Sequence, residues 1–174
     1  MGEYCSTCGS RLEERYLEKE GRKIPYCPTC EAYRFPLYNA AVSMVVMNEE
    51  RSKILLIKQY GRDRYILVAG YINQGENAET AVAREVLEET GLTVSLIEFN
   101  KSEFYAPSNT LMINFAVTVT SECVHANEEI DSYQWFSIEE ARAQIASGSL
   151  AEKFLLQYLD KNDKEETWIR RKRE

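Results

Sequence analysis

Apolar runs rich in Val, Ile, Thr and aromatic residues mark six strands along the chain, because such residues favour extended structure. The predicted strands cover residues 40–47, 53–57, 65–69, 93–99, 111–120 and 133–136. A polar segment at 48–51 separates the first two strands, and this pattern is typical of a hairpin turn.

Other segments repeat their apolar residues at helical spacing. The predicted helices cover residues 78–90, 137–148 and 150–160. Asn77 is a candidate N-cap of the first helix and Gly91 its C-terminal stop, while Ser137 and Glu140 form a capping box for the second. Residues 161–174 predict a charged tail. The order of elements indicates a mixed α/β domain.

The composition is typical of a globular chain, with 44% hydrophobic and 28% charged residues among 174. Its longest apolar stretch, residues 40–47, is far shorter than the roughly 20 residues that cross a bilayer. The N-terminus carries no readable secretory signal. We therefore expect a cytoplasmic protein without a membrane partner.

The net charge of −7 excludes a general basic surface, so nucleic acid is not an expected partner. A basic cluster at 170–173 is more typical of a solvated tail than of a nucleic-acid contact. The acidity comes mainly from Glu, which indicates either a solvated surface or a cation site.

Four of the five cysteines form two Cys-x2-Cys pairs, Cys5 with Cys8 and Cys27 with Cys30. Two such pairs can bring four thiolates to one tetrahedral point, which suits Zn²⁺ better than redox pairs or buried free thiols. A segment this short needs metal binding to fold. Residues 1–34 therefore predict a zinc ribbon, whose six basic and six acidic residues favour a structural or dimerising use.

Three carboxylates on the first predicted helix, Glu85, Glu88 and Glu89, are spaced i, i+3 and i+4 and so share one face. Their mutual repulsion indicates a bound cation, and oxygen ligands favour Mg²⁺ or Mn²⁺. The alternative is a solvated acidic helix.

Nearby residues support the cation site. Arg84 can pair with Glu76 in the preceding loop. Gly70 follows a strand, where bare backbone can bring its carbonyl close to an ion.

The spacing over residues 70–92 fits the pattern G-x5-E-x7-R-E-U-x-E-E-x-G-U, where U is a large aliphatic residue. A chance match is on the order of one in a million. The chain therefore resembles the Nudix hydrolase family. The resemblance implies an α/β/α sandwich over 35–160 and Mg²⁺- or Mn²⁺-dependent hydrolysis of a nucleoside diphosphate linked to another moiety. It also implies that Glu85, Glu88 and Glu89 bind metal, that Glu76 and Arg84 hold the loop, and that Glu88 is the general base.

Further features resemble the NADH pyrophosphatase branch of that family. A four-cysteine ribbon precedes the domain, and Ala69-Gly70-Tyr71 stands where the branch has Ala-Gly-Phe. Glu129-Ile130 and the Trp-Phe-Ser at 135–137 match a later segment. The resemblance implies Glu129 as an additional metal ligand and a homodimer.

The chain departs from the branch at residues 102–112. The branch carries S-Q-P-W-P-F-P-x-S there, a marker of dinucleotide selectivity, whereas this chain reads S-E-F-Y-A-P-S-N-T-L-M. Phe104 and Tyr105, with Tyr71, remain candidates for stacking a base, although Phe104 also suits core packing.

The expected reaction is cleavage of NADH or NAD to NMN(H) and AMP. One alternative is a hydrolase of ADP-ribose, a nucleotide sugar or another dinucleotide. Another is a non-catalytic nucleotide sensor that binds nucleic acid; otherwise NAD-capped RNA is the one nucleic acid left open. The sole histidine, His125, and Cys123 lie in the loop before Glu129 and give little support to a Ser-His-Asp or Cys-His mechanism.

Overall fold

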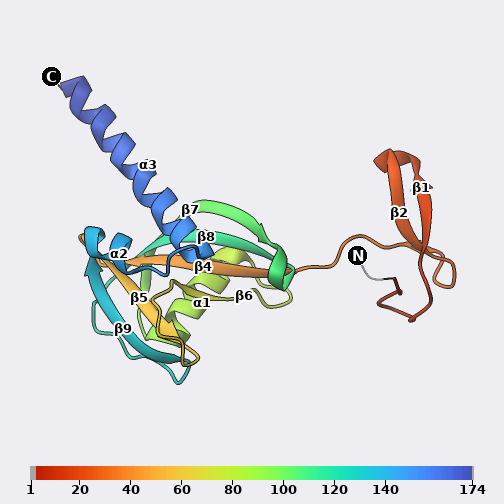
Figure 1. Cartoon of the computed structure of the whole chain (residues 1–174), viewed down its shortest axis with the longest axis horizontal. Helices are drawn as coiled ribbons and strands as arrows, with labels where there is room; N and C mark the ends of the chain where they lie inside the picture. The colour runs from red at the N-terminus through yellow and green to blue at the C-terminus, as the bar shows by residue number, and fades with distance from the viewer. Residues whose placement is uncertain (1–2, 174) are drawn as a thin grey trace. The chain divides into compact units, whose positions relative to one another are not determined.

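The computed structural model describes residues 3–162 in full and, from 163 to 173, the helical backbone alone. The chain divides into two compact units, Met1–Tyr38 and Asn39–Glu174 (Figure 1). No helix in the described part of the chain combines the length and the apolar character needed to cross a membrane.

The smaller unit is a three-stranded antiparallel sheet in the order β1-β2-β3. Its strands are β1 (Glu13–Leu17), β2 (Arg22–Cys27) and β3 (Ala32–Tyr33), with a short 3-10 helix, η1 (Glu18–Glu20), between the first two. Its buried apolar side chains are few, chiefly Ile24 and the cysteines Cys5 and Cys27. So small a core indicates that the unit depends on another source of folding energy.

The larger unit contains a six-stranded mixed sheet in which five strands follow the order β7-β8-β4-β5-β9 and β6 pairs with β4. The central strand β4 pairs in parallel with β8 along its whole length, whereas the other pairings are antiparallel. The strands are β4 (Asn39–Met47), β5 (Lys53–Gln59), β6 (Val68–Tyr71), β7 (Val94–Tyr105), β8 (Thr110–Val119) and β9 (Ile130–Ser137); a second 3-10 helix, η2 (Ala106–Ser108), joins β7 to β8.

One edge of β4 is shared by two strands. Residues 41–44 of β4 pair with β6, and Val46 and Met47 pair with β5. Strands β5 and β6 therefore separate from each other along this edge. The end of β5 and the glycine of β6 both contribute to the site described below.

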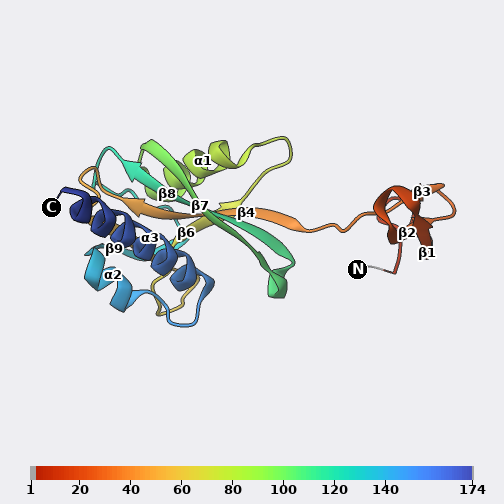
Figure 2. The ribbon, with the colours of Figure 1, turned by 90° about the horizontal axis from the view of Figure 1, so that it is seen from above.

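Helices cover both faces of this sheet (Figure 2). Helix α1 (Ala78–Thr90) buries Ala81, Val82 and Val86 against one face. Helices α2 (Ile138–Gln144) and α3 (Leu150–Arg173) pack against the other, with Phe154 and Leu155 fully buried. The predicted α/β/α sandwich with a mixed sheet is confirmed, because each apolar stripe found in the sequence faces the sheet.

Several elements differ in length from the prediction. Strand β9 spans Ile130–Ser137 instead of 133–136, and helix α2 ends at Gln144 instead of near 148. Strand β7 continues to Tyr105, with a register shift between Phe99 and Lys101 that lets pairing with β8 resume. Helix α3 continues past residue 160 to Arg173 because no Gly or Pro interrupts a segment rich in helix-forming Lys, Glu and Arg. Strand β6 begins at Val68, since Tyr65 and Ile66 form isolated bridges only.

Candidate functional site

Helix α1 carries the predicted carboxylates, and both of its ends are fixed locally. The Asn77 side chain accepts a hydrogen bond from the backbone N–H of Thr80 at 2.8 Å, and Gly91 closes the helix at φ 70°. Because the apolar stripe faces the sheet, the three carboxylates differ in burial. Glu89 is buried, Glu85 is mostly buried, and the Glu88 side chain is 57% exposed.

Arg84 ties the preceding loop to the helix, as predicted. Its Nε and Nη2 donate to the two carboxylate oxygens of Glu76 at 2.9 and 2.8 Å, and Nη2 also donates to the Tyr71 carbonyl at 3.0 Å. Hydrogen bonds from Arg84, and then from the Asn73 backbone N–H, lower the pKa of Glu76 to about 2.

Arg84 also contacts two of the candidate metal ligands. Its Nη1 donates to Glu85 Oε1 at 2.7 Å and to Glu88 Oε2 at 3.0 Å. One guanidinium thereby fixes the loop and orients two carboxylates, a task that its planar set of donors suits.

The backbone of Gly70 lies directly against Glu85. A Cβ atom at this position would overlap the Glu85 carboxylate. The structure therefore brings the Gly70 backbone and the Glu85 carboxylate together.

Glu89 is a buried acid among other acids. It accepts a hydrogen bond from Gln59 Nε2 at 3.0 Å. Burial, and then the charges of Glu85 and Glu129, raise the pKa of Glu89 to about 8. A hard divalent cation would offset both the lost hydration and the repulsion, so this donor set fits Mg²⁺ or Mn²⁺.

A loop over residues 120–129 brings Glu129 to the same place. Backbone N–H groups of His125 and Asn127 donate to the carbonyls of Thr90 and Glu89 at 2.8 and 3.0 Å, which fastens the loop to the end of α1. The Tyr60 hydroxyl donates to Glu129 Oε2 at 3.0 Å.

An open cavity of about 480 Å³ adjoins these groups. Its lining residues come from β4, the turn after β5, β6 and the loop after it, α1, the β7–β8 connection, β8 and the Glu129 loop: Ala41, Tyr60, Ala69, Gly70, Tyr71, Asn73, Glu85, Glu89, Ser108, Thr110, Met112 and Glu129. No Lys or Arg is among these lining residues.

The predicted stacking residues separate into two groups. Tyr71 lines the cavity and is 57% exposed. Phe104 and Tyr105 lie at the end of β7 and are not among the lining residues. The segment at 102–112 nevertheless reaches the cavity, through Ser108, Thr110 and Met112.

Sequence reasoning missed those three residues together with Tyr60, Asn73 and Gln59. The departure from the family pattern at 102–112 was the available signal for the first three. For Tyr60 the signal was weaker, an aromatic residue directly before Gly61 where a strand ends.

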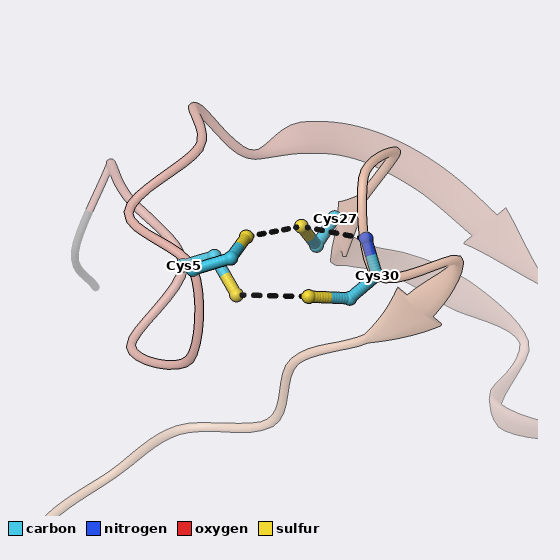
Figure 3. A group of neighbouring side chains, drawn as sticks. Cys5, Cys27 and Cys30 are labelled. Carbon is cyan, nitrogen blue, oxygen red and sulfur yellow. Dashed lines mark hydrogen bonds between the residues drawn. The ribbon is translucent and has the colours of Figure 1, made fainter.

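The four predicted zinc ligands form a second site, within the smaller unit. The sulfur atoms of Cys5, Cys8, Cys27 and Cys30 all lie within 4.8 Å of one another. Figure 3 shows the side chains of Cys5, Cys27 and Cys30 pointing toward one another. Two of the separations are 4.0 Å, for Cys5 and Cys30, and 3.5 Å, for Cys8 and Cys27. A tetrahedral Zn²⁺ with ligands at about 2.3 Å requires sulfur–sulfur distances of about 3.8 Å. The thiols therefore fit a structural zinc ion.

A polar donor favours the charged form of Cys5, whereas a hydrogen bond with Cys8, and then burial, raises the pKa of Cys30 to about 12. Arg34 Nε donates to the Cys5 sulfur at 3.1 Å, and this hydrogen bond lowers the pKa of Cys5 to about 5. The Cys30 backbone N–H donates to the Cys27 sulfur at 3.4 Å. Thiolates are the form that binds zinc.

Cys123 and His125 lie outside both sites. Both are exposed, with Cys123 Sγ and His125 Nε2 3.7 Å apart, and neither lines the cavity.

Among curated proteins, the chain is similar to relatives named NAD-capped RNA hydrolase NudC. It is 30% identical over 159 residues to the Pseudomonas aeruginosa protein and 31% over 160 residues to the Vibrio cholerae protein. These alignments cover 90% of this chain but 55% and 57% of the relatives. The chain thus spans about half the length of the curated relatives it matches.

Solved structures show a similar fold. A NUDIX hydrolase from Nitrosomonas europaea superposes with a TM-score of 0.70 and 22% identity, covering 91% of each chain. The NUDIX domain of Shewanella oneidensis NrtR, solved with ADP ribose, gives a TM-score of 0.62 and 16% identity over 78% of this chain and 93% of that one.

A family match agrees with the site geometry. Residues 37–157, well over half of the chain, match the NUDIX domain. They include the glycine, the arginine clamp, the three helix carboxylates and Glu129. The chain therefore belongs to the NUDIX family.

Proposed function

We propose that this protein is a divalent-metal-dependent hydrolase that cleaves the diphosphate of a nucleoside diphosphate linked to another moiety. The observation that carries the proposal is the convergence of Glu85, Glu89, Glu129 and the Gly70 backbone on one open cavity. Its membership of the NUDIX family and the names of its curated relatives support the same reaction.

Glu85, Glu88, Glu89 and Glu129, with the Gly70 carbonyl, would hold Mg²⁺ or Mn²⁺. When bound, such ions neutralise charge on phosphate oxygens and lower the pKa of an attacking water. Arg84 keeps Glu85 and Glu88 oriented through Nη1. Glu88, the most exposed of the three helix carboxylates, is proposed to accept the proton of that water.

The proposed substrate is NADH or NAD, cleaved to NMN(H) and AMP, and NAD-capped RNA presents the same linkage. The names of the curated relatives and the exposed ring of Tyr71 in the cavity support this choice. The Cys-rich unit is proposed to hold Zn²⁺ structurally, in a homodimer within the cytoplasm, where four thiols stay reduced.

A second candidate substrate is ADP-ribose or another nucleotide sugar. The observation that favours it is the place of Phe104 and Tyr105 outside the cavity, where Ser108 and Thr110 line the wall instead. These hydroxyls suit a sugar better than an aromatic base. The third possibility, a nucleotide sensor, predicts nucleic-acid binding without turnover.

One experiment separates these functions. The full-length, zinc-loaded protein is incubated with Mg²⁺ or Mn²⁺ and with NADH, NAD, ADP-ribose or NAD-capped RNA, and the products are resolved by chromatography. We expect NMN(H) and AMP, with activity reduced at least 100-fold in Glu89→Gln. Glu79→Gln, an exposed change in the first turn of the same helix, is the matched control and should stay active.

Each of the other outcomes would support a different function for the site. Turnover of ADP-ribose alone supports the second candidate. Salt-sensitive RNA binding without turnover of any substrate supports the sensor and overturns the proposed hydrolysis.

A further inference from the structure

Tyr60 occupies a backbone conformation that its side chain disfavours. The Arg62 N–H donates to the Gln59 carbonyl at 3.2 Å, which closes a tight turn after β5. Both central residues have positive φ, 56° at Tyr60 and 67° at Gly61. This is the pattern of a type I′ turn, in which Asn, Asp or Gly is preferred at the first central position. The backbone therefore gives no reason for a tyrosine.

Core packing gives no reason either. Tyr60 is 69% exposed and lines the cavity. A ring that stabilised the fold by burial would be covered by its neighbours.

Three consecutive residues of this turn hold three acids. Gln59 Nε2 donates to Glu89 at 3.0 Å, Tyr60 Oη to Glu129 at 3.0 Å, and the Gly61 N–H to Asp131 at 2.7 Å. The first two acceptors are carboxylates of the cavity. The hydrogen bonds of this turn thus connect the end of β5 to α1 and to the Glu129 loop.

We propose that Tyr60 is a positioning residue for the metal site: its hydroxyl holds the Glu129 carboxylate at the cavity, and the strained turn places that hydroxyl. The inference rests on the proposed function only in taking Glu129 as a metal ligand. Backbone strain of this kind persists where the surrounding structure imposes it and gathers at functional sites. Hydrogen bonds to a ligating carboxylate orient it and raise metal affinity.

The test measures Mn²⁺ binding directly, by electron paramagnetic resonance of free Mn²⁺ titrated into the zinc-loaded full-length chain. Tyr60→Phe keeps the ring and removes the hydroxyl, and we expect about tenfold weaker binding. Tyr65→Phe is the matched control, since the Tyr65 hydroxyl donates to Gln134 at 3.4 Å and touches no cavity carboxylate. It should bind Mn²⁺ as the unmodified protein does.

A second variant separates positioning from folding. Tyr60→Asn suits positive φ, so its melting temperature should equal or exceed that of the unmodified protein while Mn²⁺ binding falls by about the same factor of ten. In a Glu129→Ala background, Tyr60→Phe should cause no further loss of Mn²⁺ affinity, because the Tyr60 hydroxyl acts through the Glu129 carboxylate.

The role of Tyr60 is overturned if Tyr60→Phe leaves Mn²⁺ affinity unchanged. It is also overturned if Tyr60→Phe lowers Mn²⁺ affinity in the Glu129→Ala background as much as it does in the unmodified protein. If the unmodified protein binds Mn²⁺ but hydrolyses none of the four substrates, the proposed function fails while the Tyr60 effect is still measured. If it binds no Mn²⁺, both proposals are overturned.

Discussion

At the scale of single residues, side chains of the candidate site lie directly against backbone atoms of β6. The Glu85 carboxylate occupies the space that a side chain at residue 70 would fill. Arg84 reaches the Tyr71 carbonyl and the Glu76 carboxylate from a single position on α1. Small changes at these residues therefore alter geometry more than they alter the hydrophobic core.

Gly70→Ala tests the first of these contacts. The overlapped atoms are the flexible end of Glu85, so the side chain can move away and the melting temperature should change little. The displaced carboxylate should lower Mn²⁺ affinity and turnover by about 10- to 100-fold. Calorimetric titration with Mn²⁺ and a turnover assay check both effects. Normal Mn²⁺ affinity in this variant would contradict the assigned role of Glu85.

Glu76→Gln tests the loop clamp through pH. The pKa of Glu76 is about 2 in the folded protein, below the ordinary value of 4.5 expected on unfolding. Its ion pair with Arg84 therefore stabilises the fold above pH 4.5, and this stabilisation is lost as the pH falls towards 2. Urea unfolding should show a less stable variant at neutral pH, with the difference shrinking below pH 4.5. A constant difference across this range would contradict the clamp.

At the scale of elements, the two faces of the sheet have separate tasks. Helix α1 and the Glu129 loop line the cavity together with residues of the sheet, and their mutual hydrogen bonds join residues 90 and 125 and residues 89 and 127. The described residues of α2 and α3 cover the other face, where they belong to a buried apolar cluster, and none of them lines the cavity.

Ser137→Ala tests this separation. Ser137 caps α2 by accepting from the Glu140 N–H at 3.3 Å, while the Ser137 N–H donates to the Glu140 carboxylate at 2.9 Å. Loss of the cap should reduce the free energy of unfolding by about 1 kcal/mol and leave kcat unchanged. Chemical denaturation and a turnover assay measure the two. Ser137→Thr, which retains a capping hydroxyl, is the control, and a fall in kcat of Ser137→Ala alone would argue against separate tasks.

At the scale of the whole molecule, the two units draw their stability from different sources. The unit of residues 39–174 has a core on each face of its sheet, whereas Met1–Tyr38 has a few buried side chains and four clustered thiols. Metal binding can supply the folding energy that such a small unit lacks.

Chelation tests this difference. We expect one zinc ion per chain, and its removal should unfold residues 3–38 while the larger unit keeps its melting transition. Elemental analysis gives the stoichiometry, and amide hydrogen exchange locates the loss of structure. Cys27→Ser should reproduce the effect, and Cys123→Ser, which changes an exposed thiol outside the cluster, should not. Retained protection in the smaller unit after complete zinc removal would refute the dependence.

The sequence by itself determined the succession along the chain of the strands and helices after residue 38, both caps of α1, the arginine clamp and the identity of the helix carboxylates. These depend on periodicity and on residues close together along the chain, where spacing alone specifies the geometry. The family pattern added Glu129, which lies 40 or more positions beyond the helix carboxylates.

Only the tertiary structure decided which residues line the cavity and how each carboxylate is solvated. Tyr60 and Glu129 are 69 positions apart and meet because β5 ends beside the loop that α1 fastens. Phe104 and Tyr105 stay outside because β7 continues to Tyr105, so that the following turn and β8 reach the cavity instead. Glu89 is buried and Glu88 exposed because one face of α1 packs on the sheet, and burial depends on that packing rather than on spacing along the chain.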